Sequence, residues 1–252
     1  MSADQSIHSL SDCSNEERAT RIAGWLNSYQ TINGVRDELI GEDGKPRSHW
    51  LTLLETLADL GQPEIESRFA AARRRIDDIG MTYRVRGDLR ERPWPLSRLP
   101  VLLPEHEWKL ISEGIKQRAE LLDIILSDVY GKNELVKEGS IPAALIAGSP
   151  EYLRALHGTN PTGGKWLRIY AADIGRGPDG QWWVLGDRAQ APSGAGYALE
   201  NRLVMARTFP SLYRDMNVQR LAGYFRDMRS GLASAANRSD PRICLMTPGP
   251  WS

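Results

Sequence analysis

The hydrophobic period of the chain changes from helical to extended shortly after His157, and this change restricts the fold to helices combined with paired strands. Before it, apolar residues recur at spacings of three and four. After it, residues 166–174 and 181–185 are short apolar runs, separated at 177–180 by the strong turn sequence Gly-Pro-Asp-Gly. We therefore predict an antiparallel hairpin and an α/β (α+β) fold, in which a helical N-terminal region precedes a mixed-sheet unit.

Local signals predict where the helices begin and end. Ser14 and Glu17 have the spacing of a capping box, so a first helix is expected over residues 15–29. Further helices are expected from Ser48, as the cap, to Gly61, from Pro63 onward, from Pro104 to Gly131, and from Tyr197 to Phe209. The apolar face of the helix after Pro104 is expected to pack in the core.

A change of organisation near residue 80 predicts two regions. We assign residues 1–79 to a helical N-terminal region and residues 80–252 to the mixed-sheet domain. Residues 242–246 resemble a buried strand that leads into a Gly/Pro turn at 247–250. A core strand with nothing after this turn suggests that the domain is incomplete at its C-terminus.

The balance of charge argues against two classes of partner. Lys and Arg together number 32, as do Asp and Glu, so no global basic field exists to hold nucleic acid or an anionic membrane. The two cysteines lie far apart in sequence, and no signal peptide or apolar run of about 18 residues is present. We expect a cytoplasmic protein with neither nucleic acid nor membrane as a partner.

Several familiar site motifs are incomplete. Residues 162–165 match a P-loop only in part, because Thr159 stands where its first glycine should be and Trp166 where Ser or Thr should hold the metal. Lys165 is then expected to be a solvated turn residue. The four histidines lack zinc-site spacing. The arginines at 73–75 favour a solvated helix face over a phosphate site, because consecutive helical residues point in different directions.

The stretch from Asp187 to Arg202 is the most informative part of the chain. Its small-residue loop allows backbone to approach a ligand closely, directly after an apolar strand. Its polar groups are dense for so short a stretch, which is typical of a site at the end of a strand. The candidate site residues are Asp187, Arg188, Gln190, Ser193, Gly194, Gly196, Tyr197, Glu200, Asn201 and Arg202. The alternative is a capped helix with surface charges.

One anionic group, a substrate carboxylate, is expected to meet the loop amides and the N-terminus of the following helix, which should begin near Tyr197. Arg202 is expected to face this site together with Ser193 and Asp187. In the same hypothesis Glu200 holds the Arg202 guanidinium, and Asn201 bonds nearby backbone. The alternative is that Glu200 and Arg202 form ion pairs with neighbouring helices.

Four local patterns follow one another between Gly80 and Pro210. They are Ser-Asp-Val-Tyr at 127–130, Ile-Pro at 141–142, Pro-Ser-Gly at 192–194 with Tyr-x-Leu-Glu-Asn-Arg at 197–202, and Phe-Pro at 209–210. Together they resemble the N-terminal half of the bacterial circularly permuted ATP-grasp proteins of type 2, so that residues 80–252 would be a partial domain of this kind. The variant at 187–194 is similar to the branch that often carries, or is encoded beside, an alpha-E helical domain and a transglutaminase-like protein.

The resemblance implies a ligase that uses ATP and magnesium to activate a small-molecule or peptide carboxylate as an acyl phosphate, which an amine attacks. In relatives such as glutathionylspermidine synthetase, an acid-x-Asn pair before the loop binds magnesium. The commoner pattern Leu-Glu-Asp-Asn is replaced here by Leu-Gly-Asp-Arg at 185–188, so only Asp187 remains. Arg188 is then expected to neutralise part of the phosphate charge. The resemblance thus implies catalytic roles for Asp187, Arg188 and Arg202, with Asp187 also as the metal ligand. It implies substrate binding by the other candidate residues, which are Gln190, Ser193, Gly194, Gly196, Tyr197, Glu200 and Asn201.

Two functions of different class remain open. The first is a fragment of an ATP-dependent carboxylate–amine ligase that is inactive alone, because the family's later strands should supply the nucleotide lysines and further metal carboxylates. The second is a noncatalytic binding or scaffold module that kept the fold. Gly186 and Arg188 favour the second function, whereas Ser193, Gly194 and Arg202 favour the first.

Overall fold

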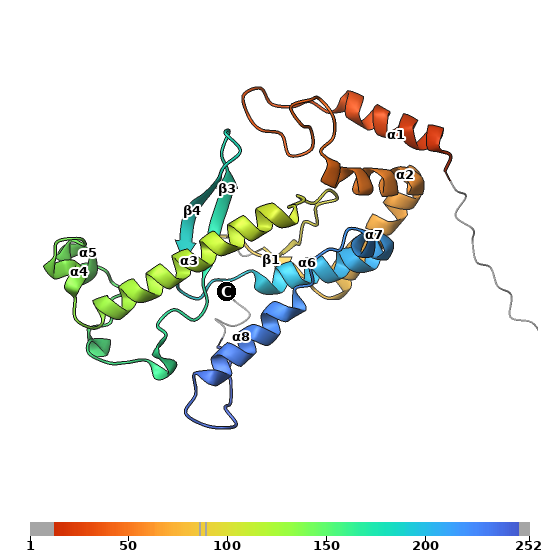
Figure 1. The fold of residues 1–252 in the computed structure, drawn as a ribbon. Helices are drawn as coiled ribbons and strands as arrows, with labels where there is room; N and C mark the ends of the chain where they lie inside the picture. The colour runs from red at the N-terminus through yellow and green to blue at the C-terminus, as the bar shows by residue number, and fades with distance from the viewer. Residues whose placement is uncertain (1–12, 86, 89, 247–252) are drawn as a thin grey trace, which may run out of the picture. The chain divides into compact units, whose positions relative to one another are not determined.

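A computed structural model describes residues 13–85, 87–88 and 90–246 (Figure 1). These residues form two compact units. Unit 1 comprises residues up to Leu102 together with Pro178–Gly180 and Ala195–Arg220, and unit 2 comprises Leu103–Gly177, Gln181–Gly194 and the residues from Leu221 onward. The described residues are mostly helical, with a few short strands in both units, which confirms the α/β fold class.

The elements of unit 1 are mostly helical. They are α1 (Asn15–Ser28), α2 (Ser48–Asp78), β1 (Thr82–Tyr83), β2 (Arg92–Pro93), α6 (Ala195–Thr208) and α7 (Pro210–Asp215). The capping box predicted for α1 is present, since Ser14 and Glu17 cap each other's backbone N–H groups. The prediction that Ser48 caps α2 is wrong, because Ser48 is the first helical residue and Arg47 is the cap. Arg47 is held in extended conformation by a hydrogen bond from its N–H group to the Leu39 carbonyl.

The long helix α2 contains the interruption that the sequence predicts. Gly61 has a positive φ of 71° and separates two helical halves, with Pro63 at the start of the second. A Cβ atom at Gly61 would lie only 3.1 Å from the Arg21 guanidinium, which donates a hydrogen bond to the Ala58 carbonyl. Glycine is therefore needed here for its left-handed conformation and for the close approach of α1.

The core of unit 1 lies between α2 and the α6–α7 segment. Apolar residues at helical spacing on α2 meet residues of α6 and α7 that are almost fully buried. The main cluster consists of Trp50, Leu53, Leu54, Leu57, Ile65, Phe69, Met205, Phe209 and Leu212. Ile76 and Val204 join a second cluster with Ala72 and Met81. The C-terminal half of α6 is thereby packed into the core of unit 1.

Unit 2 is built around one long helix and one hairpin. Its elements are α3 (Glu105–Val129), α4 (Glu134–Lys137), α5 (Ala143–Ala147), the 3₁₀ turns Arg154–Leu156 and Thr162–Gly164, β3 (Ala171–Arg176), β4 (Trp182–Arg188) and α8 (Ala222–Ser234). The apolar face predicted for α3 is buried only in part, since Ile111 and Val129 are buried but Trp108 is 44% exposed.

The predicted hairpin is confirmed: β3 and β4 pair antiparallel across the turn at residues 177–180. Arg176 at the end of β3 forms a buried ion pair with Glu107 of α3, so the hairpin is tied to this helix. Figure 1 shows α3 and the two strands next to one another. The strands also contain one irregularity, a shift of register between Asp173 and Ile174, which leaves Leu185 without a paired residue.

A buried carboxylate joins α3 to the segment before β3. Asp123 accepts hydrogen bonds of 2.8 Å from the backbone N–H groups of both Trp166 and Leu167, and its other oxygen is 3.1 Å from Lys165 Nζ. The indole of Trp166 stacks on Tyr130 at a ring distance of 4.4 Å. Lys165 is exposed, as expected for a solvated turn residue, and it also pairs with Asp123.

The prediction of a strand at residues 242–246 is wrong. These residues form no strand, and Leu245 and Met246 are 89% and 92% exposed. The reason is that no described segment forms a hydrogen-bonded ladder with them, and an apolar run by itself does not make a strand. The turn expected at 247–250 lies outside the described residues.

Candidate functional site

The carboxylate of Asp187 is held by two side chains of unit 2. The guanidinium of Arg118, from α3, donates to both oxygens, with Nε 2.6 Å from Oδ1 and Nη2 2.7 Å from Oδ2. The Tyr170 hydroxyl donates a further hydrogen bond to Oδ1. This forked contact is the geometry in which guanidinium and carboxylate match best. Asp187 therefore connects the end of β4 to α3.

These contacts determine the acidity of Asp187. The hydrogen bonds from Arg118, and then from Tyr170, outweigh the opposing effect of burial and lower the pKa of Asp187 to about 2. The same contacts raise the pKa of Arg118, and Tyr170 has a raised pKa mainly because of its burial. Asp187 is thus an anion at neutral pH whose charge is already balanced.

We expect Asp187→Asn to reduce stability in a pH-dependent way. Because the folded-state pKa is about 2 and the unfolded value about 3.9, the contribution of this carboxylate is complete above about pH 4 and is lost as the pH falls toward 2. Urea unfolding of the wild type and Asp187→Asn at several pH values measures the difference. If the difference in unfolding free energy between the two proteins stays constant from pH 6 to pH 3, the contact between Arg118 and Asp187 does not stabilise the folded protein as inferred.

Arg188 and Asp173 form a second charged pair on the opposite face of the hairpin. Asp173 pairs with Gly186 and Ala172 with Asp187, so Asp173 shares a face with Arg188 rather than with Asp187. The Arg188 Nη2 atom is 2.7 Å from Asp173 Oδ2, and its Nε is 3.0 Å from the same oxygen. Asp187 and Arg188 were predicted to act at one site, but their side chains lie on opposite faces of the hairpin.

Three residues of this arrangement were not among the sequence candidates. Arg118 lies on the predicted core face of α3, and Tyr170 and Asp173 lie within an apolar run. The strong turn between the strands was a signal that could have placed Tyr170 and Asp173 beside β4. It could not give the correct face, because the irregularity at Leu185 shifts the register by one residue.

The loop after β4 contains backbone conformations that side chains rarely adopt. Ala191 has φ of 40° and Gly194 has φ of 102°. A Cβ atom at Gly194 would meet nothing within 4 Å, so its backbone is open to approach. The Gln190 amide donates to Glu151 at 2.9 Å, and Ser193 is exposed. The loop is therefore accessible, as its small residues predict.

The helix α6 starts at Ala195, two residues before the predicted position, and its first turns pack within unit 1. Tyr197 stacks on Trp94 with ring centroids 4.2 Å apart, and its hydroxyl donates to the Thr82 carbonyl at 2.7 Å. The Trp94 indole N–H donates to Asn201 Oδ1 at 2.8 Å. Tyr197 and Asn201 thus have partners that account for both side chains structurally, whereas Gly196 has open space around its backbone.

Arg202 contacts an aromatic ring. Its guanidinium carbon lies 6.0 Å from the centroid of the Tyr213 ring. In the described part of the chain no ion pair joins Arg202 to Glu200. Arg202 belongs to unit 1, whereas Ser193 and Asp187 belong to unit 2. That Arg202 faces the same site as Ser193 and Asp187 therefore stays a prediction.

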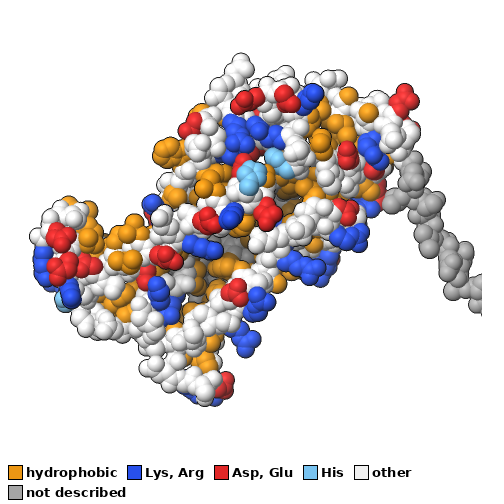
Figure 2. Space-filling view, viewed as in Figure 1, with side chains coloured by type: hydrophobic (Ala, Val, Ile, Leu, Met, Phe, Trp, Pro, Cys, Tyr) orange, Lys and Arg blue, Asp and Glu red, His pale blue; other side chains and the backbone are white. Residues whose placement is uncertain are grey.

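Within the part of the chain that the structure describes, acidic, histidine and cysteine side chains do not gather as metal ligands. Among the described residues, no three of them come close enough together to hold an ion. None of the described helices combines the length and apolarity needed to cross a membrane. On the face drawn in Figure 2, basic and acidic side chains are interspersed.

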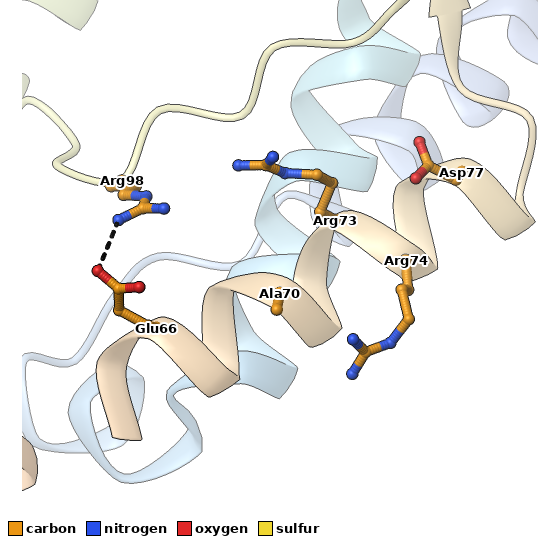
Figure 3. Close-up of a pocket in the computed structure, with 6 residues that line it drawn as sticks. All are labelled: Glu66, Ala70, Arg73, Arg74, Asp77 and Arg98. Carbon is orange, nitrogen blue, oxygen red and sulfur yellow. Dashed lines mark ion pairs between the residues drawn. The ribbon is translucent and has the colours of Figure 1, made fainter. Parts of the chain in front are cut away.

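A pocket of about 320 Å³ lies beside the second half of α2 (Figure 3). Its lining consists of Glu66, Ala70, Arg73, Arg74, Asp77 and Arg98. Figure 3 shows that Arg73 and Arg74 leave the helix in different directions, and Arg98 points to Glu66 at 3.9 Å. Because two carboxylates line the same pocket as the guanidinium groups, this arrangement favours the solvated face over a phosphate site.

Comparison with known proteins gives a consistent picture. Residues 100–252 match the family described as circularly permuted ATP-grasp type 2. An uncharacterized protein of Mycobacterium leprae is 32% identical over 241 residues, which are 95% of this chain and 43% of that protein. An uncharacterized protein of Synechocystis is 32% identical over 228 residues, covering 89% of this chain and 47% of that protein. The chain therefore spans less than half the length of these two relatives.

Proposed function

Because the chain belongs to the circularly permuted ATP-grasp type 2 family, we propose that it forms part of an ATP-dependent carboxylate–amine ligase. The family generally uses ATP and magnesium. In the proposed reaction a carboxylate oxygen attacks the γ-phosphorus of ATP, giving an acyl phosphate and ADP. An amine then attacks the acyl carbon, phosphate leaves, and the nitrogen loses a proton. The substrates are a small-molecule or peptide carboxylate and an amine.

The observation that carries this proposal is the charged end of the β3–β4 hairpin, which leads directly into an accessible loop. Arg188 is 60% exposed in its side chain and Ser193 and Gly194 follow within a few residues. Exposed guanidinium and open backbone amides are groups that bind phosphate and carboxylate oxygens. The proposed role of Arg188 is to neutralise phosphate charge, and that of Ser193 and Gly194 is to contact the substrate.

A noncatalytic binding or scaffold role is the second candidate, and the Asp187 contacts favour it. The one carboxylate that the sequence offered as metal ligand is bound on both oxygens by Arg118. In this role the hairpin would bind an anionic ligand without turnover. An alpha-E domain and a transglutaminase-like protein are proposed partners in either case.

We expect the 252-residue chain alone to show no ATP turnover. The proposal places the remaining nucleotide and metal ligands in the part that the longer relatives possess and that this chain does not match. ADP formation is measured with candidate carboxylates, and hydroxylamine is included to trap an acyl phosphate as a hydroxamate. The full-length Synechocystis relative should give carboxylate-dependent ADP and hydroxamate under the same conditions.

Heat-inactivated chain serves as the control for contaminating ATPases. Turnover by the chain clearly above this control would contradict the requirement for further segments. Failure of the full-length relative to form ADP with any carboxylate, while it binds an anionic ligand, would favour the noncatalytic role.

A further inference from the structure

The hairpin end offers a divalent cation few usable ligands. Magnesium is held by oxygen atoms in a nearly octahedral arrangement and usually requires one or two carboxylates from the protein. Two carboxylates, those of Asp173 and Asp187, are present at the paired end of β3 and β4. The question is whether either is available to a metal ion.

The first obstacle is direction. Asp187 lies opposite Ala172, and Asp173 lies opposite Gly186, one position further along each strand. Because neighbouring residues of a strand point to opposite faces of a sheet, the two carboxylates point away from each other. A single ion cannot bind both.

The second obstacle is that each carboxylate already has a cationic partner. Both oxygens of Asp187 accept from Arg118. On the other face, Asp173 Oδ2 accepts from Nη2 and Nε of Arg188 at 2.7 and 3.0 Å, and Oδ1 is 3.1 Å from Nε. Directly across from Asp173 stands Gly186, which has no side-chain oxygen. The residues present therefore do not fit magnesium.

The guanidinium of Arg188 has donors left over. Its Nε and Nη2 are engaged with Asp173, whereas Nη1 donates to none of the described residues. The side chains of Arg188 and Asp173 are 60% and 51% exposed. A guanidinium carries a permanent charge and pairs well with phosphate oxygens. Arg188 is thus in a position to meet an anion while Asp173 holds it in place.

From this geometry we infer that the Arg188 guanidinium occupies the cation position beside Asp173, and that this unit binds its phosphate-type ligand without a metal ion of its own. Asp173 is then a positioning residue for Arg188. The significance of the inference for ligation rests on the proposed function, but metal binding can be measured without ATP and without turnover.

The test uses Mn²⁺ as the probe, with electron paramagnetic resonance of free Mn²⁺ as the readout. The wild-type chain should show no specific site below roughly 1 mM. The double variant Gly186→Glu/Arg188→Asn removes the guanidinium and places a carboxylate and an amide oxygen near Asp173. A Cβ atom at position 186 meets only Asp173 Oδ2, at 3.7 Å, so the variant is sterically acceptable.

The double variant should bind Mn²⁺ at least about tenfold more tightly than the wild type. Mn²⁺ should also raise its melting temperature, because the ion relieves repulsion between the facing carboxylates. Adding Asp173→Asn to the double variant should abolish both effects, whereas adding Asp187→Asn should leave them, since Asp187 faces the other side. Circular dichroism confirms that each variant is folded.

Two results would overturn the inference. One is a wild-type Mn²⁺ site that Asp173→Asn or Asp187→Asn weakens, because the carboxylates would then be available to a metal. The other is a folded double variant that gains no binding, because the guanidinium would then not occupy a cation position. Neither result depends on whether the protein is a ligase.

Discussion

Replacing Phe209 with alanine is expected to lower the free energy of unfolding by about 3 to 5 kcal/mol, the usual cost of emptying a buried aromatic site. Phe209 is 2% exposed and packs edge-on against Phe69, with ring centroids 5.3 Å apart. It lies at the junction of α6 and α7, where both helices meet α2. The loss should therefore affect the core that holds α6.

Urea unfolding monitored by tryptophan fluorescence measures this effect. Leu99→Ala is the matched control, because it also shortens an apolar side chain of unit 1 but at a position 58% exposed, and it should change stability by less than about 0.5 kcal/mol. Similar losses from Phe209→Ala and Leu99→Ala would show that the α2–α6–α7 cluster is not the core of unit 1.

Replacing Asp123 with alanine is expected to cost at least about 2 kcal/mol, because two backbone N–H groups lose their acceptor inside unit 2. The backbone N–H groups of Trp166 and Leu167 both donate to Asp123 Oδ1 at 2.8 Å, and the residue is 7% exposed. Asp123→Asn keeps an oxygen for these donors and should cost clearly less. Lys165→Met removes only the ion pair and should have the smallest effect.

The pH dependence gives an independent check on Asp123. Burial acts to raise the pKa of this carboxyl, but hydrogen bonds from Leu167, Lys165 and Trp166 outweigh it, so the pKa lies below its usual value. Its contribution is therefore complete above the unfolded pKa of about 3.9 and decreases as the pH falls through the folded value. The stability gap between wild type and Asp123→Asn should narrow below about pH 4. A gap that widens on acidification would contradict this assignment.

The sequence by itself determined those features that depend on neighbouring residues. The capping box of Ser14 and Glu17, the interruption of α2 at Gly61 and the hairpin turn at residues 177–180 all appear in the structure. Each depends on interactions or dihedral preferences within a few residues, which any fold must respect. The family resemblance was also visible in the sequence, because its motifs are short and specific.

Residues 242–246 show where local information ends. Their apolar composition predicts a strand, yet a strand exists only if a partner forms the ladder, and no described segment does so. In the same way, the sequence did not show that Tyr197 and Asn201 both contact Trp94, which lies about a hundred residues earlier in the chain. Contacts between residues a hundred positions apart are not encoded in local patterns.

Only the tertiary structure decided which charges act together. A simple count from the turn would place Asp173 on the same face as Asp187, but the irregularity at Leu185 moves Asp173 to the face of Arg188. A shift of one residue exchanges the two faces of a strand, so it reverses every such pairing. The position of α3 then supplies Arg118 to Asp187. The residue types were readable from the sequence, whereas their partners depended on register and packing.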